Sequence, residues 1–181
     1  ERWRSDCGCQ TGGDPSWSQA WREPLRRALD WLRDELVTFY ESHASQWILD
    51  PWEARRRYPS ILAADSKRQK LERLDDLVED SLHEEETSRV LSLLEIQRHS
   101  MLMFTSCGWF FNDVSGIETI QILQYAGRIF DLLEQFDDAP KLKEPFLERL
   151  ESAESNAASY ALARDVFERE VETRRLSLAE A

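Results

Sequence analysis

Residues 88–104 read SRVLSLLEIQRHSMLMF, a stretch that is much more apolar than the charged segment before it. Its apolar residues fall on several sides of a helix, and a helix with that pattern is buried on several sides. We therefore expect a central helix here, with other helices packed around it. The apolar positions are Val90, Leu91, Leu93, Leu94, Ile96, Met101, Leu102, Met103 and Phe104.

The N-terminal part of the chain predicts helices from about residue 15 onward. Asp14 followed by Pro15 is typical of an N-cap and first turn, and Glu23 with Pro24 starts or kinks a second segment. One apolar stripe at the helical period runs along that segment. It consists of Leu25, Ala28, Leu29, Leu32, Leu36 and Phe39.

Two further helices are expected between this segment and the central one. Asp50, Pro51 and Glu53 form a capping box with proline at the first helical position. The helix that they open should stop just before Pro59, because proline disfavours helical geometry in the residue that precedes it. Residues 67–82 predict an outer amphipathic helix, with its apolar face at Leu71, Leu74, Leu77, Val78 and Leu82.

The sequence after the central helix begins with an interruption, SCGWFFNDVSG at residues 106–116. Ser115 and Glu118 then suggest a second capping box. Two more helices should follow, one with Pro145 near its first turn and one capped by Ser155 or Asn156. The helix after the interruption has its stripe at Ile117, Ile120, Leu123, Gly127, Phe130 and either Leu133 or Glu134.

The fold class predicted from these patterns is all-α, an irregular multi-helix bundle over residues 15–181 preceded by an ordered loop over residues 1–14. Only 6 Gly and 6 Pro interrupt the 181 residues. No alternation of apolar and polar residues indicates a sheet. The opening residues read as the middle of a longer chain, so the loop is expected to be a junction to a domain that precedes it.

The charge of the chain limits its partners. The formal net charge is −12, whereas nucleic acids and anionic membrane surfaces require a basic face, so neither is an expected partner. No apolar run approaches the length of a membrane span. Three cysteines leave one unpaired, and no leader-like segment is present at the N-terminus, so a reducing cytoplasm is the expected compartment.

The interruption at residues 106–116 combines an aromatic face with hydrogen-bonding groups. Sugars bind through that mixture, because their C–H faces pack on rings while their hydroxyls need donors and acceptors. Alternatively, the aromatic residues plug the end of the bundle and Asp113 caps a helix. The candidate substrate-binding residues here are Trp109, Phe110, Asn112 and Asp113, with His99 just upstream.

The N-terminal loop supplies a second group of candidates. Arg4 and Asp6 are candidate substrate contacts, while Trp3, Trp17 and Trp21 are candidate domain-interface residues. Trp17 and Trp21 are four apart, so a helix would place them on one face, which is more often core or interface than ligand platform.

Metal, cofactor and catalytic motifs are missing from the sequence. Cys7, Cys9 and Cys107 lack the usual zinc spacing and a fourth ligand, so buried free thiols are expected. No phosphate-binding glycine loop, nucleophile elbow or His-rich zinc motif occurs. Acidic runs are typical of solvated helix faces. We therefore expect no catalytic residue, metal or cofactor in these 181 residues.

Two blocks resemble a known family. They are RWRSDCGCQTGGDPSWSQAWREPLRRALDWLRDEL, residues 2–36, and QRHSMLMFTSCGWFFNDVSGIETIQILQYAGR, residues 97–128. Together they resemble the C-terminal domain of unknown function that follows the catalytic domain in a bacterial subgroup of glycoside hydrolase family 57. The ordered combination of S-D-C-G-C, T-G-G and S-C-G-W-F-F-N-D-x-S-G-I-E is long and specific.

The resemblance implies a parent polypeptide that acts on α-glucans with retention of configuration. Its N-terminal β/α barrel would carry a glutamate nucleophile and an aspartate general acid, and neither residue lies in this sequence. A helical bundle packs on the barrel mouth in that family, and a Trp-containing helix end helps to close the substrate groove. Trp109 and Asp113 match that element.

The expected function is therefore that of an accessory helical domain, which packs on the catalytic barrel of the same polypeptide and helps to shape its α-glucan cleft. The alternative is a purely structural or protein-interaction module that docks through Trp17, Trp21 and Trp31 without touching substrate. The second reading predicts that alanine at Trp17 and Trp21 weakens docking but leaves saccharide contacts unaffected.

Overall fold

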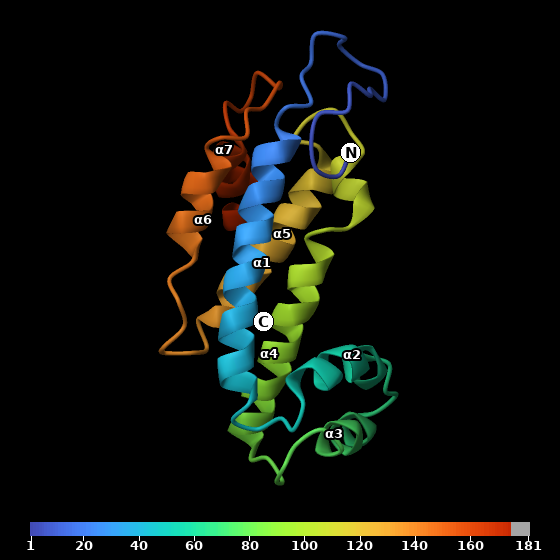
Figure 1. Ribbon diagram of the computed structural model, residues 1–181, viewed down its shortest axis with the longest axis vertical. Coiled ribbons are helices and arrows are strands. Elements are labelled where there is room, and N and C mark those ends of the chain that lie inside the picture. Colours follow the sequence, from blue (N-terminus) through green and yellow to red (C-terminus); the bar gives the residue numbers. More distant parts are fainter. Residues whose placement is uncertain (175–181) are drawn as a thin grey trace. The chain divides into compact units, whose positions relative to one another are not determined.

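A computed structural model describes residues 1–174 of the chain, and within them every regular element is helical (Figure 1). The all-α fold class is confirmed. Two isolated β-bridges, Ile48 with Val78 and Glu154 with Leu162, are the only strand-like pairings in that range. The α-helices are α1 (Arg22–Ala44), α2 (Pro51–Leu62), α3 (Lys67–Asp75), α4 (Glu84–Leu102), α5 (Ile117–Leu133), α6 (Lys143–Leu150) and α7 (Ala163–Val166). A 3₁₀ turn, η1 (Ser106–Trp109), precedes α5, and α7 continues through η2 (Phe167–Val171) and η3 (Glu172–Arg174).

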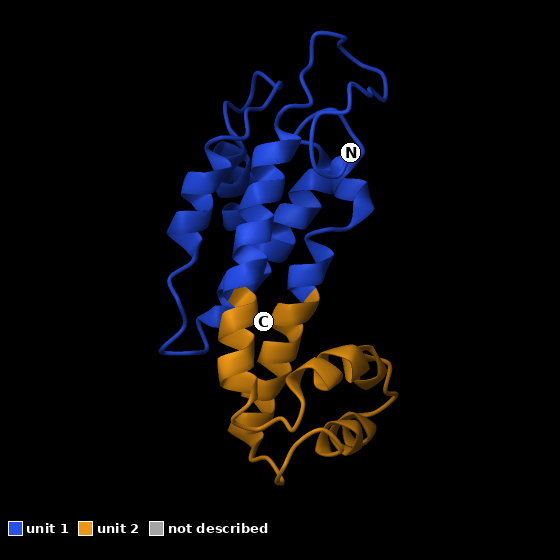
Figure 2. Cartoon of the chain, viewed as in Figure 1, with its two compact units in different colours: residues 1–35, 99–181 blue, residues 36–98 orange. Residues whose placement is uncertain are grey.

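Contacts divide the chain into two compact units (Figure 2). Unit 1 comprises residues 1–35 and 99–181, and unit 2 comprises residues 36–98. The last seven residues of the predicted bundle, 175–181, lie outside the described residues.

The core of unit 1 is built largely from α1, α5 and the α6–α7 segment. Phe130 of α5, Phe146 of α6 and Phe167 form an aromatic cluster, with ring centroids 5.7, 6.3 and 5.9 Å apart. A Cβ added to Gly127 would lie 2.6 Å from Val171, so α5 and η2 approach closely at this glycine. The buried stripe of α1 in this unit is Leu25, Ala28, Leu29 and Leu32, and Trp21, just before the helix, is buried as well.

Unit 2 has its own core and its own hydrogen bonds. The Tyr40 hydroxyl donates to the Pro51 carbonyl (2.5 Å), and the Tyr58 hydroxyl donates to the Glu95 carboxylate (2.8 Å). Both tyrosines are buried, and so are several aliphatic side chains of α2, α3 and α4. These include Ala54, Ile61, Leu74, Val90, Leu93 and Leu94.

Three predictions of helix position are confirmed. The stretch at residues 88–104 forms most of α4, which begins four residues earlier than expected. The Asp50 carboxylate accepts the Glu53 N–H at 2.9 Å, as an N-cap should, but the Glu53 carboxylate binds Arg56 and does not complete the predicted capping box. Pro145 lies in the first turn of α6.

Three helix ends predicted in the N-terminal half are wrong. Asp14 does not start a helix, because its carboxylate accepts the Ser16 N–H (2.8 Å) and hydroxyl (2.6 Å) in a local turn, and α1 begins at Arg22. Pro59 lies inside α2, where burial of neighbouring core side chains outweighs the lost backbone hydrogen bond. The helix over 67–82 ends at Asp75, since residues 77–79 pair with 47–49 instead.

Two caps predicted in the C-terminal half are also wrong. The Ser115 hydroxyl donates a hydrogen bond to the Asp113 carboxylate, and α5 begins after Gly116. Ile117 is 77% exposed, so it does not belong to the buried stripe of α5. Ser155 and Asn156 likewise bind Asp113. The last helix instead begins at Ala163.

Candidate functional site

The N-terminal loop and the central loop, residues 1–21 and 105–116, are joined in unit 1 through the Asn112 side chain. Its Oδ1 accepts the Thr11 N–H (3.1 Å) and hydroxyl (3.2 Å), and its Nδ2 donates to the Gly12 carbonyl. Gly12 has a φ of +96°, a conformation that side-chain-bearing residues rarely adopt. One buried amide therefore fixes two segments about a hundred residues apart in the sequence.

The start of α1 forms a second set of contacts with the central loop. Trp21 Nε1 donates to the Asn112 carbonyl (3.2 Å), and Arg22 Nη2 donates to the Phe111 carbonyl (3.0 Å). Trp21 also stacks on Trp109, with ring centroids 6.4 Å apart and planes 10° from parallel. Trp21 and Arg22 thus hold the backbone of residues 111–112 by hydrogen bonds, and the stacking of Trp21 on Trp109 fixes the start of this segment.

Asp113 connects the central loop to a third segment, residues 155–157. Its Oδ1 accepts the Ser115 N–H (2.9 Å) and the Ser155 hydroxyl (2.9 Å), and its Oδ2 accepts the Asn156 N–H (2.5 Å). Burial by itself would raise the pKa of Asp113, but hydrogen bonds from Ser115, Asn156 and Ser155 outweigh it and hold the pKa below the usual value. Asp113 is therefore a structural carboxylate, ionised at neutral pH.

These contacts surround an open cavity of about 420 Å³, which we call the loop cavity. Trp17 and Phe111 supply aromatic surface, whereas Thr11, Ser115 and Glu118 supply hydroxyl and carboxylate groups. Its size lies within the roughly 300 to 1,000 Å³ typical of small-molecule sites. The full lining is Thr11, Gly12, Trp17, Phe111, Asn112, Asp113, Ser115, Gly116 and Glu118.

Two of the candidate substrate-binding residues, Asn112 and Asp113, line the loop cavity, and so does Trp17, which was predicted as a domain-interface residue. Trp109 does not, because its side chain is completely buried. The resemblance implied that the Trp109 ring helps to close a substrate groove, but in the described fold this ring exposes no face to a ligand. Trp21 is 2% exposed, so in the described fold it too is a core residue and not a surface contact.

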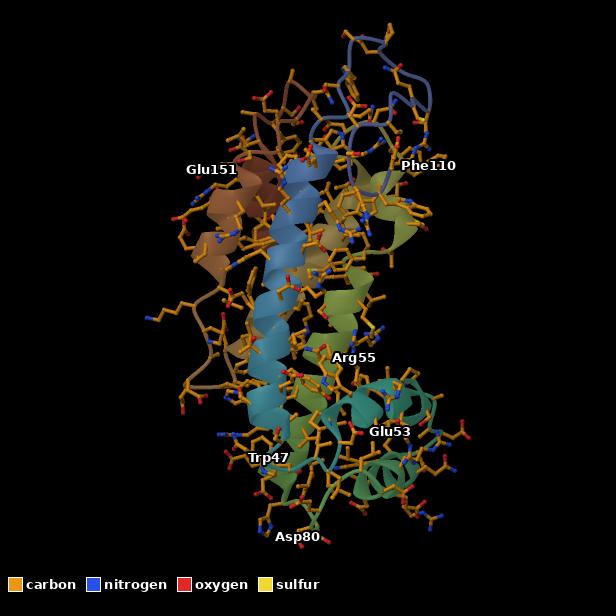
Figure 3. The ribbon with its side chains drawn as sticks, in the orientation of Figure 1. Trp47, Glu53, Arg55, Asp80, Phe110 and Glu151 are labelled. Carbon is orange, nitrogen blue, oxygen red and sulfur yellow. The ribbon has the colours of Figure 1, made fainter. Side chains whose placement is uncertain are left out.

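The other predicted residues lie elsewhere in unit 1. Phe110 is 47% exposed beside the cavity residue Phe111, at the edge of the unit (Figure 3). Trp3, Arg4 and Asp6 are exposed in the N-terminal loop. The His99 ring lies against Tyr125 of α5, with ring centroids 5.6 Å apart.

Several cavity residues were not predicted. Phe111 belongs to the predicted aromatic face but is not among the candidate residues, whereas Phe110 is, and nothing local in the sequence distinguishes the two. Glu118 was assigned to a capping box, and its position at the cavity depends on α5 starting after Gly116. Thr11 and Gly12 belong to the T-G-G motif, whose only local signal is a turn.

The thiols contradict the expectation of burial. Cys9 and Cys107 are exposed and Cys7 is half-buried, and all three are free thiols. A hydrogen bond from Cys9, supported by Arg2 and Arg22, lowers the pKa of the Cys7 thiol to about 7. Among residues 1–174, no group of three or more His, Cys, Asp or Glu side chains is placed to hold a metal ion.

The fold and the site define an all-α domain with a polar and aromatic cavity formed where loops meet. The chain belongs to the family described as Domain of unknown function (DUF3536), whose family model matches residues 17–181. No curated protein and no solved structure matches the chain. Within the described part of the chain, no helix is both long and apolar enough to cross a membrane.

Proposed function

We propose that this chain is an accessory helical domain of a glycoside hydrolase family 57 type polypeptide, and that its loop cavity contributes a subsite for α-glucan. The observation that carries the proposal is the meeting of the two sequence blocks that resemble that family. The T-G-G motif and the F-F-N-D motif lie about a hundred residues apart, yet Asn112 binds both Thr11 and Gly12.

The lining of the loop cavity supports a saccharide as the ligand. The rings of Trp17 and Phe111 offer apolar faces for sugar C–H groups, while Thr11 and Glu118 offer groups for hydroxyls. A neutral saccharide also suits a chain with a net charge of −12, which disfavours anionic ligands.

The buried candidates have a supporting role in this proposal. Asn112 and Asp113 already use their side-chain oxygens on backbone and hydroxyl groups, so they shape the cavity and leave the sugar contacts to its exposed residues. Rigid support of the cavity walls favours affinity, because little conformational freedom of the lining side chains and loops remains to be lost when a ligand binds.

A pair of neighbouring phenylalanines provides a matched test. Phe111 lines the cavity and Phe110 does not, although both are substantially exposed. Phe111→Ala should weaken binding of a maltooligosaccharide by roughly 1 to 3 kcal/mol, whereas Phe110→Ala should leave it nearly unchanged. Calorimetric titration of the full-length polypeptide measures both, and equal effects of the two variants would contradict the proposal.

The parent polypeptide offers a second test. If it carries the barrel with its two catalytic carboxylates, removing residues 1–181 should reduce its turnover of α-glucans or its thermal stability. Unchanged activity and stability, or a different fold in the preceding segment, would contradict the accessory role. Turnover of maltooligosaccharides by the isolated chain would contradict our assignment of catalysis to another domain.

A docking function without saccharide contact is the second candidate, and the exposed aromatic residues favour it. Trp3 is 56% exposed and Phe110 is 47% exposed, so both offer apolar area to a neighbouring domain. Of the tryptophans first considered, Trp21 is buried and the Trp31 ring is covered by the Arg149 guanidinium at 3.9 Å. Trp3→Ala with Phe110→Ala should then weaken association with the preceding domain while saccharide affinity stays unchanged.

A further inference from the structure

Arg22, the first residue of α1, is a fully buried arginine. Its Nη1 lies 3.6 Å from the Cys7 Sγ and its Nη2 donates to the Phe111 carbonyl, while its Nε has no hydrogen-bond partner. Among the described residues Arg22 forms no ion pair with a carboxylate, and Asp6 acts on it only through longer-range electrostatics. A buried guanidinium stays charged, so the group best placed to balance it is a Cys7 thiolate.

Two neighbours complete the surroundings of Cys7. The Arg2 guanidinium, which lies over the Phe110 ring at 4.8 Å, also lowers the pKa of Cys7. The Cys9 thiol donates to the Cys7 carbonyl at 3.5 Å, and Cys9 makes the largest contribution to the low pKa of Cys7, about 7. One guanidinium in contact, a second that lowers the pKa of Cys7 and a neighbouring thiol therefore act on one half-buried sulfur, the environment in which cysteines become nucleophilic.

We propose that Cys7 and Cys9 form a reactive dithiol site, which takes small-molecule disulfides as its substrate. Cys7 thiolate attacks one sulfur of R–S–S–R, forming a Cys7–S–S–R bond and releasing RS⁻. Cys9 then loses its proton to solvent and attacks the Cys7 sulfur, forming the Cys7–Cys9 disulfide and releasing the second RS⁻. The small disulfide is thereby reduced by two electrons and the two cysteines are oxidised.

The local backbone permits that ring to close. Residues two apart cannot be separated by more than about 7 Å between Cα atoms, which overlaps the span of about 4.4 to 6.8 Å for disulfides. Gly8, between the cysteines, has a φ of +66° and nothing within 4 Å of its Cβ position, so the turn has room to adjust. The site is independent of the proposed saccharide function, although Arg22 connects it to the Phe111 carbonyl.

Cys107 is an internal control, because it is exposed and free. Alkylation of the reduced chain over a range of pH should give a midpoint near 7 for Cys7. At neutral pH Cys7 should react several-fold faster than Cys107, because two arginines favour the Cys7 thiolate. Arg2→Gln should raise the Cys7 midpoint, and Arg2→Lys, which keeps the charge, should restore most of it.

The product with oxidised glutathione tests the second step. Trypsin releases Cys7 and Cys9 together in the peptide of residues 5–22, so mass spectrometry should show that peptide two hydrogens lighter. Cys9→Ser should trap one glutathione on Cys7, Cys7→Ser should abolish the fast reaction, and Cys107→Ser should behave as the unmodified chain. Equal reactivity of Cys7 and Cys107, a lasting glutathione adduct on Cys7 in the presence of Cys9, or a bond from Cys7 to Cys107 would each overturn the proposal.

Discussion

Trp109 supports the loop cavity from within the core, where it stacks on Trp21. Trp109→Ala should lower the free energy of unfolding by about 3 to 5 kcal/mol, the cost of deleting a fully buried ring. Phe110→Ala, one residue along and 47% exposed, should change it by less than about 1 kcal/mol. Denaturant unfolding of the two variants measures the difference, and similar small losses would show that Trp109 is not structural.

Asp113 gives a pH-dependent prediction. Its folded pKa is below the unfolded value, so its ionised form contributes stability above about pH 4, and that contribution is lost as the pH falls through the folded pKa. Asp113→Asn should cost about 1 to 3 kcal/mol at neutral pH and flatten the loss of stability on acidification. Asp75→Asn, at an exposed position, is the control; unfolding curves with the same acid dependence in both variants would contradict this role.

At the scale of elements, the existence of the helices could be predicted from the sequence, but several of their ends could not. Helical periodicity is local, so the stretch at residues 88–104 was recognisable in isolation. Ser115 and Asn156 are of residue types that often cap helices, yet both hydrogen-bond to Asp113 instead. A Ser or Asn side chain can hydrogen-bond either to the N-terminus of its own helix or to a group that is distant in the sequence. Which bond forms depends on the folded chain, so the sequence alone does not show it.

The close approach of α5 to η2 allows an element-scale test at Gly127. Gly127→Ala would place a Cβ 2.6 Å from Val171 Cγ1, so either the Val171 side chain or η2 itself must shift. Alanine improves helix propensity by about 1 kcal/mol, but overpacking costs about 1 to 3 kcal/mol, so a net loss of stability is expected. Gln121→Ala on the exposed face of α5 should be neutral or slightly stabilising. A stabilised Gly127→Ala variant in thermal unfolding would show that η2 moves freely.

At the scale of the whole chain, the sequence indicated the two loops that build the site but not which of their residues face solvent. The roles of Trp109 and Phe111 illustrate this, because both are aromatic residues in one short run, yet the first is buried and the second lines the cavity. Burial there depends on Trp21 stacking across the unit, a contact between residues far apart in sequence. Local composition cannot distinguish the two.

The division into two compact units leads to the last prediction. Tyr58 is buried in unit 2, where its hydroxyl binds Glu95, and no residue of the loop cavity or of the dithiol site belongs to that unit. Tyr58→Ala should therefore lower amide protection in α2 and α3 while leaving the amides of α5 protected, since compact units open separately.

The reciprocal change, Trp21→Ala, should lower protection in α5 and raise the Cys7 alkylation midpoint, because Trp21 precedes Arg22 in the chain. Hydrogen exchange followed by mass spectrometry resolves these segments. A uniform loss of protection across both units in Tyr58→Ala would mean that the chain opens as one cooperative body, and the site in unit 1 would then depend on the packing of unit 2.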